Sequence, residues 1–456
     1  MTETIYYVLS GLLIFIIMFG IYLMSKVKYA KLGNNLSAIS VFAAVILTLL
    51  KYDVVDEWII YVFIALGAII GIFLAYKVKM IAMPQMIALL NGLGGLASLI
   101  VGGFAYFGVG VDSLNAFSDV VAIIAVIIGT ITFVGSVIAA LKLHRVISQK
   151  PIKVKFYSGI ISLLFLIQLV AIAISPFRII DKIIFIIIII LVSSIFSVIF
   201  TIRIGGADMP ITISLLNSLS GVAGAISGLA IGDVLLVAIG GIVGASGLIL
   251  TEIMCKAMNK GLIDILLGKT SGGSVTYVEN EEVVNESVKQ DFKEVYKNSK
   301  SVIIVPGYGM AVAQAQQLVK ALADKMKKEH KTVKYAIHPV AGRMPGHMNV
   351  LLAEVNVDYE DLYDMEMIND EFKQTDLVIV VGGNDVINPK AKTHEGTPIY
   401  GMPILDVDLA KDIFIFNYDK NPGYSGVTNS LYNKNNVQLF LGDAKETLQK
   451  FIDDVK

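Results

Sequence analysis

Charged side chains are scarce in this chain of 456 residues: Asp, Glu, Lys and Arg make up 16% of it. An ordinary soluble domain carries about 25%, and 55% of this chain is hydrophobic, so the composition indicates a membrane protein. The net charge of −1 gives no reason to expect a nucleic-acid partner. The single cysteine, Cys255, cannot form an internal disulfide. The N-terminal "MTETIYY" lacks the basic start of a cleavable targeting segment.

Long hydrophobic runs fill the first half of the chain. A run of about 20 apolar residues crosses a bilayer as a helix. We therefore expect nine spans in a transmembrane domain over residues 1–260, at about 4–25, 36–51, 58–76, 83–107, 117–141, 155–174, 179–201, 208–230 and 234–255.

Lysine and arginine gather on alternate loops between these spans. Basic residues follow the first, third, fifth, seventh and ninth spans, and residues 142–155 form the most basic loop. Arg178 and Lys182 are exceptions to the alternation. Because basic loops face the cytoplasm, we expect an outer N-terminus and a cytoplasmic C-terminal half in a bacterial inner membrane.

The composition changes at about residue 261. Residues 268–290 are polar and acidic and contain Gly and Ser, which is typical of a linker, so we expect a linker or collar over 261–300. From residue 301 short apolar strands alternate with helical stretches, and the strands are "SVIIVPG", "TVKYAIHP", "DLVIVVGGND", "DIFIFNYD" and "VQLFLGDAK". This alternation predicts a soluble α/β doubly wound, Rossmann-like domain over 301–456. Its clearest predicted helix is "AVAQAQQLVKALADKMKKE".

The segment "VPGYGMAVAQAQ", residues 305–316, places two glycines between a strand and a helix. Gly307 and Gly309 would let backbone N–H groups face a pyrophosphate with no side chain in the way. Val312 replaces the third glycine of the dinucleotide-binding pattern. By itself, the turn therefore fits nucleotide binding and a plain strand-to-helix connection equally well.

Two other predicted strand ends carry polar groups beside glycines. Arg343 lies in "VAGRMPG", where its guanidinium would bind a phosphate through two N–H groups. Asp385 follows the glycine pair of "VVGGND". Taken singly, Arg343 fits a surface cation and Asp385 fits a helix cap. Three such strand ends in one domain indicate a ligand at the carboxyl edge of the sheet.

The C-terminal half contains five motifs in a fixed order: "PGYGMAVAQAQ", "IHPVAGRMPGHMNVLLAE", "GGNDVINP", "GMPIL" and "NPGYSGV". They resemble the successive signatures of the beta subunit of proton-translocating nicotinamide nucleotide transhydrogenase. The membrane half is similar to that family's last spans in "GGADMPITISLLNSLSG" and "IMCKAMNKG". The resemblance covers nearly the whole chain.

This resemblance implies an enzyme made of two kinds of subunit. The C-terminal domain would bind NADP(H), the nine-span domain would be a proton channel, and a separate alpha subunit would hold NAD(H). Hydride would pass directly between the two nicotinamides, so no catalytic side chain and no metal are expected. The family suggests an assembly of two alpha and two beta subunits in the lipid bilayer.

The resemblance also implies a set of cofactor-binding residues in the turns and loops after the predicted strands. They are Gly307, Tyr308, Gly309, Met310, Ala311, Val312, His338, Val340, Ala341, Gly342, Arg343, Met344, Pro345, Gly382, Gly383, Asn384, Asp385, Val386, Gly401, Met402, Asn417, Tyr418, Lys420, Gly423, Tyr424, Asp443 and Ala444.

The sequence departs from the family in the loop expected to bind the 2′-phosphate of NADP. The family has a Lys-Arg pair there, whereas this chain has Asn417 and Tyr418, followed by Asp419. A carboxylate repels a phosphate and is common in pockets that bind NAD. Either Lys420 restores the phosphate contact and NADP use is retained, or binding is relaxed or prefers NAD(H).

A second departure concerns the proton path. Part of the family has a proton-relaying histidine in the fourth span, where this chain has Asn91, and its five histidines lie outside the predicted spans. Either the alpha subunit supplies the titrating group or pumping is lost. The candidate residues for the path and its coupling are Asn91, Ser136, Asn217 and Asp208. Interhelical hydrogen bonding, or helix capping by Asp208, is the alternative role.

One other class of function fits a membrane domain joined to a nucleotide-binding domain. The protein would then be a nucleotide-gated transporter or channel whose C-terminal domain only senses NAD(H). The ordered family motifs favour the transhydrogenase.

Overall fold

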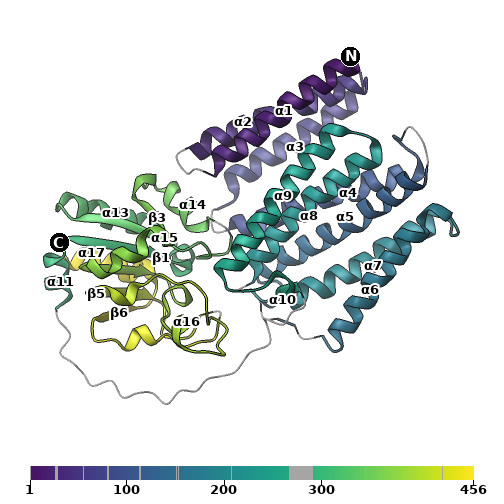
Figure 1. Ribbon diagram of the computed structural model, residues 1–456. Coiled ribbons are helices and arrows are strands. Elements are labelled where there is room, and N and C mark those ends of the chain that lie inside the picture. The colour runs from purple at the N-terminus through teal and green to yellow at the C-terminus, as the bar shows by residue number, and fades with distance from the viewer. Residues whose placement is uncertain are drawn as a thin grey trace. The chain divides into compact units, whose positions relative to one another are not determined.

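The computed structural model describes residues 2–25, 29–54, 56–79, 82–111, 115–149, 151–152, 154–206, 208–266, 291–344, 346–423 and 425–455. The chain forms two compact units (Figure 1). The membrane unit comprises Met1–Ser148, Ile152–Arg203 and Thr212–Leu250. The sheet unit comprises Gln149–Pro151, Ile204–Ile211 and Thr251–Lys456. Residues 267–290 of the predicted linker lie outside the described residues.

Long helices make up the first part of the chain. They are α1 Glu3–Met24, α2 Ala30–Lys51, α3 Trp58–Lys77, α4 Met83–Phe107, α5 Ala116–Leu143, α6 Tyr157–Ile174, α7 Lys182–Arg203, α8 Met209–Ile231 and α9 Val234–Ala257. Within the described residues, these nine helices are long and apolar enough to cross a membrane. The predicted multispanning fold class is therefore confirmed.

The second helix begins at Ala30, earlier than the predicted start near residue 36. Its first turns include the exposed Asn34 and Asn35, which made the apolar run look shorter. A Cβ on Gly33 would lie 2.4 Å from the carbonyl oxygen of Gly20, so α1 and α2 meet backbone to backbone there. This close approach stabilises a helical turn that hydropathy alone does not predict.

Helix α5 forms the centre of the membrane unit. Its Ala122, Ile123 and Val126 are fully buried in a cluster that also includes residues of α4 and α7. Between α4 and α5, a Cβ on Gly95 would lie 2.8 Å from the carbonyl oxygen of Gly129. Small residues thus allow the backbones to approach and to gain dispersion contacts, which replace the hydrophobic effect inside a bilayer.

The two basic residues that departed from the charge alternation both have partners within the membrane unit. Arg178 donates from Nε and Nη2 to the two carboxylate oxygens of Asp119, at 3.0 and 3.3 Å. Lys182 donates from Nζ to the carbonyl oxygen of Tyr106, at the C-terminal end of α4, at 2.7 Å. These contacts account for basic residues in a loop where the alternation predicts few.

The sheet unit contains a six-stranded sheet whose described pairings are all parallel. The strands are β1 Ser301–Pro306, β2 Thr332–Ile337, β3 Leu362–Asp364, β4 Leu377–Val381, β5 Asp412–Asn417 and β6 Val437–Leu441. Their order is β3-β2-β1-β4-β5-β6, which confirms the predicted doubly wound fold. The five predicted strands are present. The edge strand β3 was missed because its three residues show no apolar alternation.

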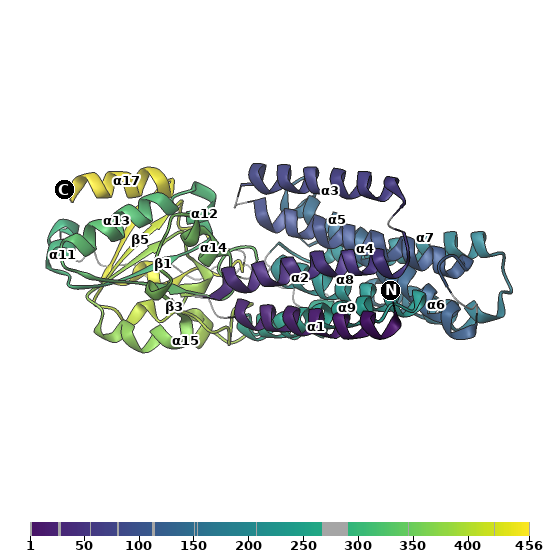
Figure 2. The ribbon, with the colours of Figure 1, turned by 90° about the horizontal axis from the view of Figure 1, so that it is seen from above.

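The predicted helix over 311–329 is wrong in one respect, because it is two helices. Gln314 has φ of 53°, which ends α12 (Tyr308–Ala313) before α13 (Gln316–Lys328) begins. Figure 2 shows α13 and α17 on one face of the sheet and α15 on the other. The other helices of this unit are α10 Leu262–Leu266, α11 Phe292–Asn298, α14 His347–Glu354, α15 Met365–Ile368, α16 Lys390–Thr393 and α17 Ala444–Asp454.

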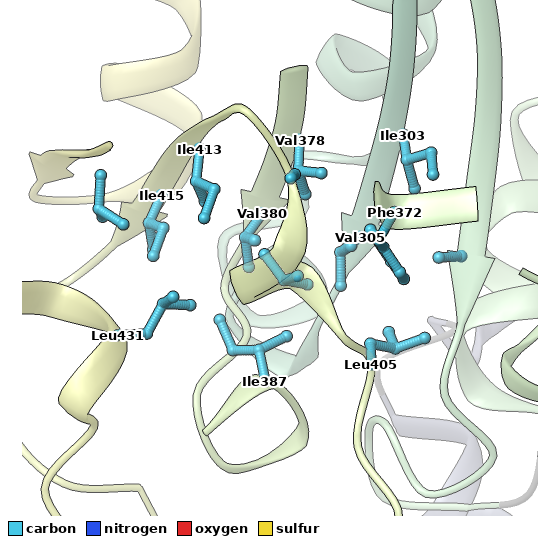
Figure 3. Close-up of a cluster of buried hydrophobic side chains, with 14 of the residues drawn as sticks. Ile303, Val305, Phe372, Val378, Val380, Ile387, Leu405, Ile413, Ile415 and Leu431 are labelled. Carbon is cyan, nitrogen blue, oxygen red and sulfur yellow. The ribbon is translucent and has the colours of Figure 1, made fainter. Parts of the chain in front are cut away.

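Apolar side chains from β1, β4 and β5 form the core of the sheet unit (Figure 3). Val378 and Val380 of β4 are fully buried between Ile303 and Val305 of β1 and Ile413 of β5. Each such side chain contributes about 1.5–3 kcal/mol to folding. This core fixes the strands rigidly, so their carboxyl ends present the following loops in defined positions.

Candidate functional site

The glycine turn after β1 lies directly against the end of β4. Gly307 N donates to Val381 O at 2.8 Å, and Gly309 N donates to Gly382 O at 2.9 Å. A Cβ on Gly307 would lie 2.3 Å from Gly382 O, so a side chain has no room there. These two N–H groups are thus engaged with Val381 and Gly382, and the expectation that backbone N–H groups of this turn face a pyrophosphate stays a prediction. The turn places α12 at the switch point between β1 and β4, where doubly wound sheets bind ligands.

Arg343 is 3% exposed and lies in the loop between β2 and α14. Its guanidinium carbon lies 4.5 Å from the ring centroid of Tyr308 on α12, an arrangement that stabilises a cation over an aromatic face. Its Nη2 also donates to Oε1 of Gln149 at 3.3 Å. The structure thus brings together two predicted site residues, Tyr308 and Arg343, from the ends of two strands.

His347 belongs to this cluster and was missed at the sequence level. Its Nδ1 accepts from the backbone N–H of Arg343 at 3.1 Å, and a Cβ on Gly342 would lie 2.4 Å from that atom. Burial, together with the Arg343 charge, lowers the pKa of His347 from 6.5 to about 4. The ring is therefore neutral at neutral pH, with its proton on Nε2. The available signal was a histidine four residues after Arg343 in the glycine-flanked "GRMPGH".

Folding lowers this histidine pKa, which gives the loop a pH dependence with a definite sign. The neutral ring is favoured in the folded state, so its contribution to stability is complete above the ordinary value of 6.5. That contribution is lost progressively as the pH falls from 6.5 toward about 4.

His338 connects the end of β2 to the segment after Gly401 through a hydrogen bond. Its Nε2 donates to the carbonyl oxygen of Pro403 at 2.8 Å, because Nδ1 accepts from Val340 N at 3.3 Å. Burial lowers the pKa of His338 to about 4. This predicted site residue therefore holds together two loops that carry other predicted site residues. Ala341, Met344 and Met402 are buried beside these loops.

Asp385 holds the segment after β5 against the end of β4. Its carboxylate accepts from Ser425 Oγ at 2.6 Å and from Ser425 N at 3.1 Å. A Cβ on Gly423 would lie 2.8 Å from Oδ2, so the predicted residues Asp385 and Gly423 are in contact. Asn384 donates to Asn421 O at 3.0 Å and tightens the same connection. Burial raises the pKa of Asp385, and the two Ser425 donors oppose that rise.

The loop predicted to bind the 2′-phosphate has its own internal hydrogen bonds. Asn417 is 9% exposed, and its amide donates to Gly383 O at 2.9 Å and to Tyr432 Oη at 2.7 Å. Tyr418 is 78% exposed. Asp419 accepts from the backbone and side-chain nitrogens of Asn421, at 2.9 and 2.7 Å. The amide of Asn417 thus serves the fold, whereas Tyr418 and Lys420 project from it.

Asp443, a predicted cofactor-binding residue, has a structural role at the start of a helix. It is the N-cap of α17 and accepts from Lys445 N at 2.8 Å, as short polar residues at helix starts do. Ala444 is buried behind it. Met310 and Ala311 are buried in α12, whereas Val312 is half exposed. Two predicted residues, Pro345 and Tyr424, lie outside the described residues.

Three of the polar residues predicted for a proton path lie in the membrane unit. Asn91 on α4 donates from Nδ2 to Ile213 O on α8 at 3.4 Å. Ser136 on α5 is fully buried, and its Oγ has no hydrogen-bond partner in the described part of the chain. A Cβ on Gly92 would lie 3.1 Å from the Ser136 Cβ, so Ser136 packs against Gly92, the residue after Asn91. Asn217 is half-buried one turn after Ile213. The structure thus gathers polar groups of α4, α5 and α8.

Asp208, the fourth of these residues, forms an ion pair with Lys260 within the sheet unit. Its side chain is nearly fully buried, and the pair joins the chain just before α8 to the chain just after α9. The sequence pattern did not reveal this partner, and the available signal was that Lys260 is one of two lysines that closely follow the predicted last span.

Matches to known proteins cover nearly the whole chain. The family model described as NAD(P) transhydrogenase beta subunit matches residues 3–454. A protein of Rhodospirillum rubrum named NAD(P) transhydrogenase subunit beta is 40% identical over 477 residues, which covers 98% of this chain and 97% of the relative. A protein of the same name from one strain of that species gives the same values.

Proposed function

The chain belongs to the NAD(P) transhydrogenase beta subunit family, and from this premise we propose that its sheet unit binds NADP(H) at the carboxyl edge of the sheet. Members of this family are the beta subunits of an oxidoreductase that uses NADP(H) and NAD(H) and that contains an alpha subunit. The nine apolar helices make the chain an integral membrane protein. Family membership favours this enzyme over a nucleotide-gated transporter or channel.

One observation carries the proposed nucleotide site. The buried Arg343 guanidinium, stacked on Tyr308, lies in the loops that follow β1 and β2, next to the switch point between β1 and β4. A guanidinium held in this way is suited to a phosphate, because its geometry is fixed before the ligand binds. The nicotinamide supplies the hydride chemistry when bound. The chain's own residues orient the dinucleotide and fix the loops around it.

His338, His347 and Asp385 act in this proposal as residues that position loops. His347 orients the backbone of Arg343, and His338 holds the 401–405 segment. Asp385 holds the segment around Gly423. Because both imidazoles are neutral at neutral pH, they add no charge beside a nucleotide phosphate.

Coenzyme preference is set in the proposal by residues 417–420. Where the resemblance implies a pair of cations, this chain has a buried amide at Asn417 and an exposed ring at Tyr418, so Lys420 is the cation of this loop. The Asp419 carboxylate accepts hydrogen bonds from Asn421. We propose that NADP(H) binding is retained through Lys420 with weaker discrimination against NAD(H).

Changing Tyr418 to Arg tests this loop without disturbing its core. Tyr418 is exposed, whereas Asn417→Lys also breaks the hydrogen bonds to Gly383 and Tyr432. We expect Tyr418→Arg to tighten NADPH binding relative to NADH by roughly ten- to a hundredfold, the value of a charge-assisted hydrogen bond of about 1.5–3 kcal/mol. Dissociation constants of both coenzymes measure it, with Tyr418→Gln as the uncharged control. An unchanged ratio in Tyr418→Arg means that this loop does not set the preference.

We further propose that hydride transfer is coupled to proton movement through the membrane unit. Asn91, Ser136 and Asn217 would form the hydrogen-bonded path, and the Asp208–Lys260 pair would transmit its state toward the nucleotide site. The proposal includes an outer N-terminus, a cytoplasmic sheet unit, a bacterial inner membrane and two copies of each subunit. It keeps the predicted boundaries 1–260, 261–300 and 301–456 for the proton-channel domain, linker and NADP(H)-binding domain.

A proton gradient imposed on proteoliposomes of both subunits tests this coupling. Hydride transfer between NADH and NADP⁺ is close to thermoneutral, and one charge crossing 100 mV supplies about 2.3 kcal/mol. We therefore expect the final NADPH/NADP⁺ ratio to shift by tens of fold, and an uncoupler is the control. A ratio that does not respond to the gradient would remove the proton-pumping part of the proposal and leave the hydride transfer in place.

A further inference from the structure

A buried carboxylate in the membrane unit has no role in the function proposed above. Asp233, the residue before α9, is 4% exposed. It accepts from Tyr6 Oη on α1 at 3.1 Å and from Tyr52 Oη at the end of α2 at 3.3 Å. Its other oxygen accepts from Leu236 N in the first turn of α9, at 2.7 Å. Three helices therefore meet around one acidic side chain.

The chain path gives the membrane face on which Asp233 lies. Helix α8 begins one residue after Asp208 and runs for 23 residues, so it is about 34 Å long and spans the bilayer. Asp233 follows its far end. Asp233 thus lies on the membrane face opposite to Asp208. The contacts with Tyr6 and Tyr52 place the start of α1 and the end of α2 on that same face.

The groups around Asp233 are neutral donors rather than a permanent cation. Lys51 at the end of α2 is engaged elsewhere, because its Nζ lies 5.3 Å from the Tyr6 ring centroid and 3.5 Å from Glu3 Oε1. Helix α8 contributes no ionisable residue. Among the residues that the structure describes, no lysine or arginine forms an ion pair with Asp233. Asp119, by contrast, accepts hydrogen bonds from Nε and Nη2 of Arg178.

Asp119 and Asp233 are the two buried carboxylates in the described part of the membrane unit, and their partners give them different chemistry. Protonation of a carboxylate that an arginine binds removes the ion pair and leaves the guanidinium without its partner. A carboxylate held by hydroxyl groups exists in either protonation state, because a hydroxyl both donates and accepts. Asp233 also lies at the end of the helix that carries Asn217, with the buried Ser227 between them.

We propose that Asp233 is the proton-exchanging group of the membrane unit on the face opposite to Asp208. The carboxylate accepts a proton from the aqueous phase beside Glu3 and Lys51. It then releases that proton to a water molecule on the side of α8 and returns to the carboxylate form. The Tyr6 and Tyr52 hydroxyls keep their protons throughout and change only the direction of their hydrogen bonds. This inference rests on the proposed coupling to protons and adds the residue at which the proton path meets the second aqueous phase.

A purely structural role for Asp233 makes a different prediction. If the carboxylate only ties α1 and α2 to α9, then Asp233→Asn keeps both sets of contacts, because the amide oxygen accepts from Leu236 N and the amide NH2 donates to the tyrosine hydroxyls. That variant would behave as the wild type, and Asp233→Ala would be impaired. If Asp233 exchanges protons, Asp233→Asn fails as severely as Asp233→Ala in proton-linked turnover, and Asp233→Glu retains activity with a shifted pH profile.

Proteoliposomes of both subunits, with NADH and NADP⁺ as substrates and a pH-sensitive dye, separate these roles. In Asp233→Asn we expect proton movement and steady-state turnover to fall by roughly a hundredfold, as when a proton-transfer group is lost. A single hydride transfer between nucleotides already bound should keep its wild-type rate. Glu3→Gln, which removes an exposed carboxylate on the same face, is the matched control and should behave as the wild type.

Two results would overturn the assignment of Asp233. One is an Asp233→Asn enzyme with wild-type turnover and pH profile, and the other is an Asp233→Asn chain that loses assembly or single-turnover hydride transfer. Wild-type proteoliposomes that form NADPH without moving protons would refute the proposed coupling itself, together with this inference. The wild-type measurement therefore distinguishes failure of the coupling from failure of Asp233 alone.

Discussion

Replacing Gly382 with alanine should destroy the nucleotide site and unfold the carboxyl edge of the sheet. Gly382 has φ of +71°, and a Cβ there would lie 2.3 Å from both Gly309 Cα and Met310 N. The backbone cannot yield, because Gly309 N donates to Gly382 O. The left-handed conformation alone costs about 1–2 kcal/mol with a side chain, and the clash adds to it. We expect a total cost of roughly 4 kcal/mol or more, the range of exceptional single substitutions.

Gly426→Ala is the matched control for this prediction. Its φ of +72° is nearly the same, but nothing lies within 4 Å of an added Cβ. It should therefore show the backbone strain without the clash. Hydrogen exchange at β1 and β4 in the full-length chain, together with NADPH affinity, measures both variants. Equal behaviour of the two variants would show that contact between the glycine turn and β4 does not matter.

Arg343→Ala should weaken NADP(H) binding more than any other single change that leaves the sheet intact. The guanidinium is preorganised by Tyr308 and Gln149, so its phosphate contacts would form without further ordering. Loss of charge-assisted hydrogen bonds of about 1.5–3 kcal/mol each predicts an affinity lower by roughly a hundredfold or more.

Arg343→Lys separates the contribution of the planar guanidinium donors from that of the positive charge. Lysine keeps the positive charge but loses the planar pair of donors and the stacking on Tyr308, so its affinity should fall between those of the wild type and Arg343→Ala. Lys320, which pairs with Asp324 on α13, offers a surface control in Lys320→Ala. Full NADPH affinity in Arg343→Ala would show that this guanidinium does not bind the nucleotide.

Hydropathy and alternation predicted most of the architecture because the features concerned are local. Nine apolar runs became nine helices within the described residues, and five strand patterns became strands of one parallel sheet. The helix break at Gln314 and the strand β3 were not predicted, because both depend on tertiary packing. Gln314 has a left-handed backbone conformation without being a glycine, and β3 pairs with β2 along three residues.

The site was predicted by position but not by contact. Sequence motifs placed Arg343, Asp385 and Gly423 in one region, and the structure supplied the partners that hold them. His347, the Asp208–Lys260 pair and the Tyr6–Asp233 contact join residues whose pairing has no local sequence signal. The glycine turn is a further example, because its sequence does not reveal that the N–H groups of Gly307 and Gly309 donate to Val381 and Gly382.

Equilibrium binding of NADPH and NADH to the full-length chain in detergent is the decisive measurement for the proposed nucleotide site. We expect saturable binding of NADPH that NADP⁺ displaces and that Arg343→Ala weakens. A wild-type chain that is folded yet binds neither coenzyme would contradict this proposal.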